Sequence, residues 1–249
     1  MVLGGAGGKR LFGITRRVMR IVAVASEPME FPGILARAQE IRAMDVGADW
    51  ARLARFGPQE WLLVANGAGA RRAGAALDAI LPGFAADVLV STGFCGAVTP
   101  ELGVGEIIVA TEVVGETACF PAERFSASPP HYSGVVRTID RIAQTAKEKR
   151  KWRDTGASAV EMEAAAVGER AVRYGLPFYC VKAVTDEAGE NLANDLNRAL
   201  RPDGHFDTIV VLGSVLRRPM VRLPELVRLR KRSVRAARAL GDFFANCRF

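Results

Sequence analysis

Short apolar segments alternate with helix-forming segments along most of the chain, and this alternation restricts the fold more than any other feature. The first apolar segment, Arg20–Ser26, is partly β-branched and precedes a predicted helix over residues 28–43. Further strands are predicted over residues 50–56, 60–66, 88–91, 106–114, 134–138, 157–160 and 177–185. A long loop is expected over residues 115–133 and a polar helix over residues 141–153. This order predicts an α/β fold in which helices flank a central, mostly buried mixed β-sheet.

The length of 249 residues fits a single large α/β domain, and no repeat or linker divides it. Residues 1–18 are Gly-rich and basic, and we interpret them as a loose N-terminal extension. Residues 19–212 form the expected α/β domain, and residues 213–249 form an expected basic helical tail.

The net charge of +7 is concentrated in this tail. Residues 213–249 hold ten Lys or Arg and two acids, a net charge of +8, so the rest of the chain carries −1. Apolar residues from Leu226 to Phe243 recur at helical spacing, which predicts a basic amphipathic helix. Such a helix either lies on an anionic membrane surface or packs on the body of the protein. Nothing resembles a nucleic-acid-reading motif, and we expect no nucleic-acid partner.

No segment approaches the roughly 20 apolar residues that a membrane-spanning helix needs. The four cysteines are widely spaced and the chain has two histidines, so neither a disulfide framework nor a metal site is predicted. We expect a cytoplasmic protein without cofactor, associated with the inner face of the membrane only if the tail binds lipid.

Carboxylates follow three of the predicted strands. Glu30 comes after the first strand, Glu161 and Glu163 follow the short strand near residue 160, and Asp186 ends the strand that starts at Pro177. Ligand sites of α/β sheets lie at these strand ends. Taken singly, each carboxylate also fits a helix start or an N-cap.

Their combined order resembles the nucleoside phosphorylase and nucleosidase superfamily, specifically its methylthioadenosine/S-adenosylhomocysteine nucleosidase branch, from about Arg20 to Leu200. The most specific segment is Val160–Ala164 (Val-Glu-Met-Glu-Ala), with Asp186 following 23 residues after Glu163. The turn Gly93–Gly96 (Gly-Phe-Cys-Gly) ends 67 residues before Glu163. The resemblance implies a phosphorylase/hydrolase-like sheet and a homodimer.

The resemblance also implies roles for the matching residues. Asp186 corresponds to the acid that protonates the purine at N7, and Glu30 to the carboxylate that activates water. Glu163 corresponds to the acceptor of the ribose hydroxyls, and Met162 packs against the sugar. The further expected substrate contacts are Glu161, Phe94, Gly96 and Ile142. Two carboxylates in different environments can supply an acid and a base at one pH.

Two positions depart from the family pattern. Ile142 or Ala143 stands where the nucleosidases carry an aromatic residue that stacks on the base, and Phe94 replaces a small residue. A second resemblance, over Leu196–Gly204 and Leu216–Pro219, is to the hopanoid-associated phosphorylase subgroup, which implies a lipid-linked adenine nucleoside of the adenosylhopane type.

We therefore expect hydrolysis of a 5′-modified adenine nucleoside, either soluble or lipid-linked. The superfamily's phosphorylases hold phosphate with arginines at the positions of Glu30 and Ser91, and a carboxylate repels phosphate. A phosphorylase that uses Arg71 or Arg72 stays open as an alternative. A non-catalytic nucleoside-binding or membrane-surface protein is the alternative of another class.

Overall fold

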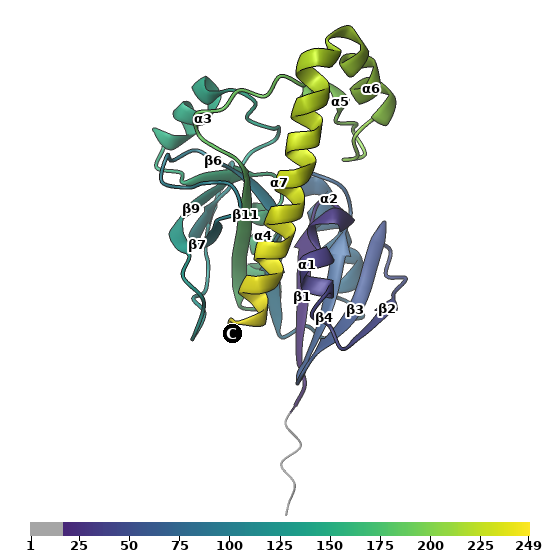
Figure 1. The fold of residues 1–249 in the computed structure, drawn as a ribbon. Coiled ribbons are helices and arrows are strands. Elements are labelled where there is room, and N and C mark those ends of the chain that lie inside the picture. Colours follow the sequence, from purple (N-terminus) through teal and green to yellow (C-terminus); the bar gives the residue numbers. More distant parts are fainter. Residues whose placement is uncertain (1–16) are drawn as a thin grey trace, which may run out of the picture.

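The computed structural model describes residues 17–249, so all but two residues of the expected extension lie outside the described residues. This part of the chain forms an eleven-stranded mixed sheet with helices on both faces, as predicted (Figure 1). The strand order is β2-β3-β4-β1-β5-β11-β6-β10-β9-β7-β8. The bounds are β1 (Met19–Ala25), β2 (Glu40–Ala43), β3 (Trp50–Phe56), β4 (Gln59–Ala65), β5 (Val88–Ser91), β6 (Phe94–Ala97), β7 (Ile107–Val114), β8 (Cys119–Pro121), β9 (Tyr132–Thr138), β10 (Ala159–Glu161) and β11 (Phe178–Asp186).

Alternating side chains of β1 serve two separate cores, because successive residues of a strand point to opposite faces. Val22 and Val24 pack in the cluster with α2 (Ala70–Ile80) and α4 (Ala164–Tyr174). Ile21 and Ala23 pack on the other face, with α1 (Pro32–Leu35) and α7 (Pro219–Ala245). Burial on both faces explains why this strand is continuously apolar in the sequence.

The second half of the sheet closes on itself. β11 pairs in parallel with β5 and β6, and its middle also pairs antiparallel with β7. β6, β10, β9 and β7 then complete a ring that returns to β11. As a result, β11 is central to both halves, and its carboxyl end carries Asp186 into the middle of the molecule.

Three predicted elements differ in the structure. The helix expected over residues 28–43 is only a 3₁₀ turn, η1 (Pro28–Glu30), followed by the four-residue α1. Residues 40–43 instead form the exposed edge strand β2, which pairs antiparallel with β3. Helix α3 (Ala146–Arg153) begins at residue 146 rather than 141, because Thr145 and Glu148 form a capping box there. The expected loop over 115–133 includes β8.

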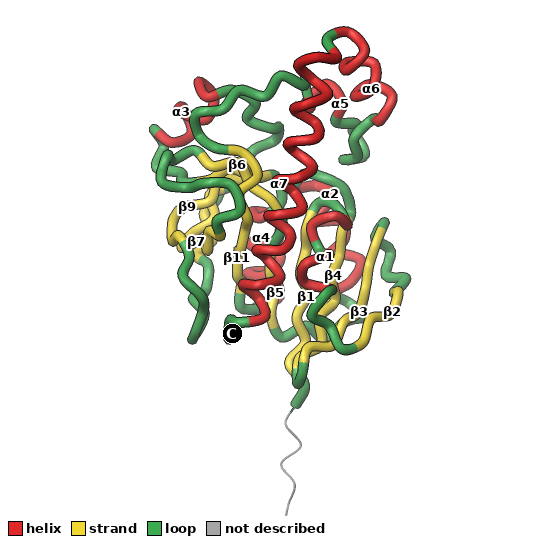
Figure 2. Tube along the Cα trace, viewed as in Figure 1, coloured by secondary structure: helices red, strands yellow, loops and turns green. Residues whose placement is uncertain are grey.

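The expected boundary between residues 212 and 213 falls inside α6 (Thr208–Arg217), which follows the short α5 (Leu196–Ala199). The long helix α7 runs across the whole molecule (Figure 2). Its C-terminal half belongs to the core, where Ala236, Leu240, Phe243 and Phe244 are buried. In the described residues no helix is long and apolar enough to cross a bilayer.

Candidate active site

The carboxyl ends of β1, β10 and β11 and the strand β6 meet at a cavity of about 530 Å³, a size typical of small-molecule sites. Residues from α5, the 201–206 loop and α7 line its opposite side, among them Leu196, Phe206 and Leu229. All eight residues expected from the sequence line this one cavity: Glu30, Phe94, Gly96, Ile142, Glu161, Met162, Glu163 and Asp186. The structure therefore brings the candidate residues together.

Glu30 is buried in the turn that follows β1. The Ser26 hydroxyl donates a hydrogen bond to its Oε1 atom at 2.6 Å, and the backbone N–H of Phe94 donates another. Burial raises the pKa of Glu30 to about 7, and the Ser26 bond and the charge of Lys182 oppose this rise only in part. Gly93 leaves room for the carboxylate, since a Cβ there would lie 1.8 Å from Oε2. A carboxylate that titrates near neutrality can act as a general base.

Glu161 and Glu163 lie side by side where α4 begins. The Glu161 carboxylate accepts bonds from the backbone N–H groups of Glu163 and Ala164 at 2.9 Å, and from the Thr138 hydroxyl at 2.5 Å. These bonds occupy its oxygens and fix the α4 N-terminus. Among the described residues, Glu163 accepts one backbone hydrogen bond, from Gly69 to Oε1 at 2.8 Å. Its Oε2 atom accepts none there and lies 4.0 Å from Lys182 Nζ.

The buried Lys182 sits between these carboxylates. Its Nζ atom lies 2.9 Å from Glu161 and 4.0 Å from Glu163, and it donates to the Thr92 carbonyl at 2.8 Å. Burial lowers the pKa of Lys182, but the two carboxylates outweigh this and raise it. Burial and the neighbouring Glu161 charge raise the pKa of Glu163 to about 8 despite Lys182. Lys182 is therefore a shared counter-ion for two buried acids, Glu161 and Glu163.

Asp186 pairs with a different lysine. Lys149 of α3 is fully buried, and its Nζ atom lies 2.5 Å from Asp186 Oδ2 and donates to the Glu187 carbonyl at 2.6 Å. The Thr185 hydroxyl donates to Oδ1 at 3.0 Å. Gly96 lies beneath the carboxylate, where a Cβ would come within 2.9 Å of Oδ2. The side chain is 13% exposed and faces the cavity.

Ile142 lies in the loop before α3, and Asn197 of α5 holds it there. The Asn197 side chain accepts from the Ile142 N–H at 2.8 Å and donates to its carbonyl at 2.9 Å. Ala143 also lines the cavity, so both candidates for the missing aromatic position face it. Phe94 opens β6, and Met162 follows β10.

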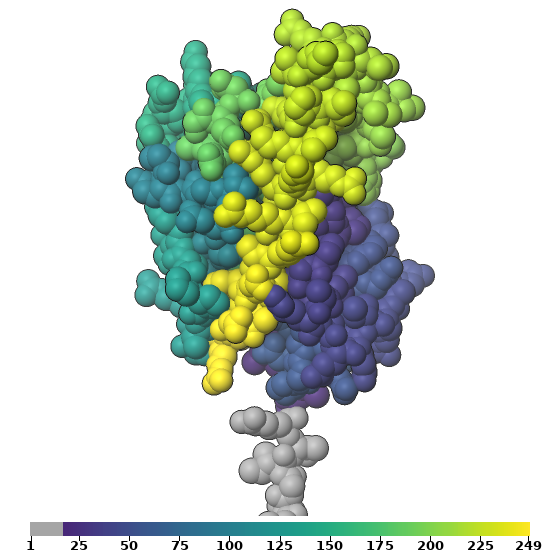
Figure 3. All heavy atoms as spheres, in the orientation of Figure 1, coloured from purple at the N-terminus to yellow at the C-terminus, as the bar shows by residue number. Residues whose placement is uncertain are grey.

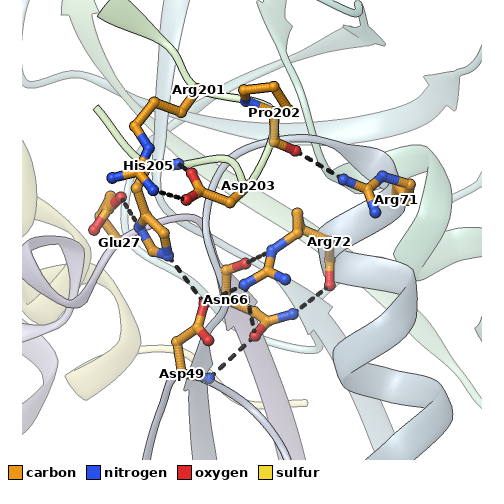
Figure 4. Close-up of polar contacts among 9 residues, drawn as sticks. All are labelled: Glu27, Asp49, Asn66, Arg71, Arg72, Arg201, Pro202, Asp203 and His205. Carbon is orange, nitrogen blue, oxygen red and sulfur yellow. Dashed lines mark hydrogen bonds and ion pairs between the residues drawn. The ribbon is translucent and has the colours of Figure 1, made fainter. Parts of the chain in front are cut away.

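The arginines considered as an alternative anion site are engaged elsewhere. Arg71 donates to the Pro202 carbonyl at 2.8 Å, and Arg72 contacts the Asn66 carbonyl and Asp49 (Figure 4). They hold the 201–206 loop and the start of α2 rather than facing the cavity. His205 of this loop bridges Asp49 and Glu27 at 3.0 and 3.2 Å.

The sequence interpretation missed Lys149, Lys182, Ser26 and His205. Lys182 had a signal, because it is the one charged residue among the apolar residues 178–184. Lys149 had none, since a lysine in the polar segment 146–153 is unremarkable. Within the described residues no group of three or more His, Cys, Asp or Glu could hold a metal ion.

Comparisons with known proteins agree with this geometry. The sequence model of a family described as "Phosphorylase superfamily" matches residues 21–134 and 121–204. A 5′-methylthioadenosine/S-adenosylhomocysteine nucleosidase of Geobacillus thermodenitrificans is 24% identical over 202 residues, which cover 69% of this chain and 86% of that protein. The corresponding protein of Anoxybacillus flavithermus is 28% identical over 159 residues, covering 52% and 68%.

Solved structures share the fold. The nucleosidase of Campylobacter jejuni superimposes with a TM-score of 0.68 at 17% identity, over 91% of this chain and 97% of that chain. Futalosine hydrolase of Helicobacter pylori gives a TM-score of 0.65 at 16% identity, over 90% and 96%. A Colwellia psychrerythraea nucleosidase in complex with adenine gives 0.64 at 17%, over 90% and 95%.

Proposed function

The chain belongs to the phosphorylase superfamily, and from this premise we propose that it hydrolyses the N-glycosidic bond of a 5′-modified adenine nucleoside. The observation that carries the proposal is one cavity lined both by Asp186, which pairs with Lys149, and by Glu30 and Glu163, which are near Lys182. We call the surroundings of Asp186 the base end and those of Glu30 and Glu163 the sugar end. Cleavage of this bond builds positive charge on the sugar and negative charge on the base. An acid beside the base and carboxylates beside the sugar stabilise both charges.

At the base end, the protonated form of Asp186 gives its proton to N7 of the departing purine, and the carboxylate that remains is stabilised by the Lys149 ammonium. The Thr185 hydroxyl and the Lys149 ammonium fix both carboxyl oxygens, which holds the acid in one orientation toward the cavity. Phe94 and Ile142 supply apolar contacts to the base in place of a stacked aromatic ring.

At the sugar end, Glu163 accepts the ribose hydroxyls through the oxygen that Gly69 leaves open. Glu30 removes a proton from the attacking water, and its raised pKa suits this role near neutral pH. Glu161 positions Glu163 through the α4 N-terminus and Lys182. Met162 packs against the sugar.

Hydrolysis is favoured over phosphorolysis by the charge at the sugar end. Glu27, Glu30, Glu161 and Glu163 all line the cavity, and Lys182 is already paired. Each of these acids repels phosphate when it is ionised, and the repulsion is stronger in a buried site than in water. Among the described residues that line the cavity, Arg141 is the only arginine, and it forms an ion pair with Glu148 at 2.9 Å.

An apolar 5′ substituent is favoured by the lining between α5 and α7. Leu192, Leu196, Phe206 and Leu229 border this side of the cavity. Such a surface fits a methylthio group, and it also fits a longer hydrocarbon, as in a nucleoside of the adenosylhopane type. We favour the lipid-linked substrate. A homodimer and a cytoplasmic location stay predictions.

The test is product analysis with methylthioadenosine, adenosine and an adenosine bearing a 5′-alkyl chain, each with phosphate absent and in excess. We expect adenine and a free sugar under both conditions, with the 5′-alkyl compound cleaved at the highest kcat/KM. A strict phosphate requirement with a sugar 1-phosphate product would overturn hydrolysis and point to Arg141. Binding without cleavage of any nucleoside would favour the non-catalytic alternative.

A further inference from the structure

Two helices at one end of the molecule carry large apolar side chains that the protein itself leaves uncovered. On α6 these are Ile209, Leu212 and Leu216, which are 57–81% exposed, and on α7 they are Met220, Leu223 and Val227, which are 48–89% exposed. Each set follows the spacing i, i+3, i+7 and therefore forms one stripe along its helix. Nine of the fourteen exposed large apolar residues in the described chain lie between residues 206 and 234, so this is a patch rather than scatter.

The same segment is strongly basic. Five exposed cationic side chains accompany the stripes: Arg217, Arg218, Arg228, Arg230 and Lys231. The two acids between residues 207 and 231 are engaged in the fold. Asp207 caps α6, and the buried Glu225 accepts backbone hydrogen bonds from Ala193 and Asn194 at 2.7 Å.

We propose that α6 and the N-terminal half of α7, residues 208–231, dock on an anionic lipid surface. The apolar stripes would enter the headgroup region while the arginines contact lipid phosphates. A second copy of this chain fits the face less well, because two such faces would bring ten or so like charges together. Figure 3 shows this segment, in light green to yellow, forming the end of the molecule opposite the C-terminus.

The docking face adjoins the rim of the cavity. Phe206, which directly precedes the α6 N-cap Asp207, is 37% exposed and also lines the cavity. Docking would therefore place the rim beside the lipid, where a nucleoside with a hydrocarbon chain would reside. The lipid contact itself is independent of the reaction in the cavity.

Point variants test the face better than a deletion, because the C-terminal half of α7 is part of the core. The full-length chain is sedimented with phosphatidylcholine vesicles that contain or lack phosphatidylglycerol, at low and high salt. The test variant is Leu216→Glu with Met220→Glu. Val172→Glu with Tyr174→Glu on α4 is the matched control, since these side chains are also exposed, at 72% and 41%.

We expect binding only to vesicles with phosphatidylglycerol, weakened by salt through screening. The Leu216/Met220 variant should lose at least about tenfold in partitioning, because each side chain contributes burial of its apolar surface. The control variant should bind like wild type, and both should cleave methylthioadenosine unchanged if the proposed function holds.

The proposal is wrong if the wild-type chain ignores anionic vesicles at low salt, or if the control variant loses as much binding as the test variant. A different outcome is that the wild-type chain does not bind vesicles but forms a dimer, and that the Leu216/Met220 variant is monomeric. This outcome would show that a second copy of the chain covers the face. If the wild-type chain binds vesicles but does not cleave methylthioadenosine, only the proposed function is contradicted.

Discussion

The two ends of the cavity differ in how many buried lysines neutralise their buried carboxylates. At the base end, Asp186 has its own buried lysine, Lys149, in direct contact. At the sugar end, Glu30, Glu161 and Glu163 share Lys182, and burial raises the pKa of Glu30 to about 7 and of Glu163 to about 8. Where cations are fewer than acids, the surplus acids keep their protons until near-neutral pH. The sugar end is thus built to change protonation state in the physiological range.

Lys182→Met should have the largest effect, because it removes the cation that the sugar-end acids share. Breaking a buried ion pair costs about 3–5 kcal/mol of unfolding free energy. Urea denaturation at neutral pH measures this loss, and Lys149→Met is the matched control, since Asp186 is closer to solvent than Glu161. Equal losses in both variants would show that the two ends do not differ in the way we describe.

The base end should show its role in the choice of leaving group. Asp186→Asn should reduce cleavage of an adenine nucleoside by about 10² or more, the usual contribution of general acid catalysis. Lys149→Met should lower it in the same direction, because the acid loses its positioning contact. The leaving group of a nitrophenyl riboside needs no proton, so either substitution should reduce cleavage of that substrate far less.

Glu30→Gln is the control for this assay, because water must be activated whichever group leaves. It should reduce cleavage of both substrates. If Asp186→Asn reduces cleavage of the nitrophenyl riboside as strongly as that of the nucleoside, Asp186 is not the acid.

The sequence predicts the residues of this site that lie at strand ends, but not those that a loop or helix brings to it. Glu30, Glu163 and Asp186 follow strands, and strand ends converge in an α/β sheet, so their meeting could be predicted. The pairing of Lys149 with Asp186 could not, because it depends on how the loop before α3 lies across the end of β11. The edge strand β2 was missed for a similar reason. Its alternation of polar and apolar residues, Glu40–Ala43, spans only four exposed residues, and what makes it a strand is its backbone pairing with β3.

Glu163→Gln should sharpen the comparison from the sugar side. A charge-assisted hydrogen bond contributes about 1.5–3 kcal/mol. Above pH 8, where Glu163 is ionised, losing the carboxylate should therefore cost a ribonucleoside roughly tenfold or more in kcat/KM. A 2′-deoxynucleoside lacks one of the two hydroxyls and should lose less. Kinetics on the matched pair of substrates measure this difference, and equal losses on both would remove Glu163 from the ribose.

The pH dependence tests whether the sugar-end acids titrate near neutral pH. Glu30 works as a base only when ionised, so its ionisation should raise kcat/KM about tenfold per pH unit below about 7 and contribute no further rise above it. Glu163 adds a second rise in kcat/KM near pH 8 in wild type, which Glu163→Gln should remove.

The free energy of unfolding should change with pH in the opposite direction. The folded state holds these protons above the ordinary carboxyl pKa of 4.5, so unfolding free energy should fall as pH rises from about 4.5 through 7 to 8. Denaturation at pH 5 and pH 8 measures this, and a protein that is more stable at pH 8 would show that the sugar-end acids are fully compensated after all.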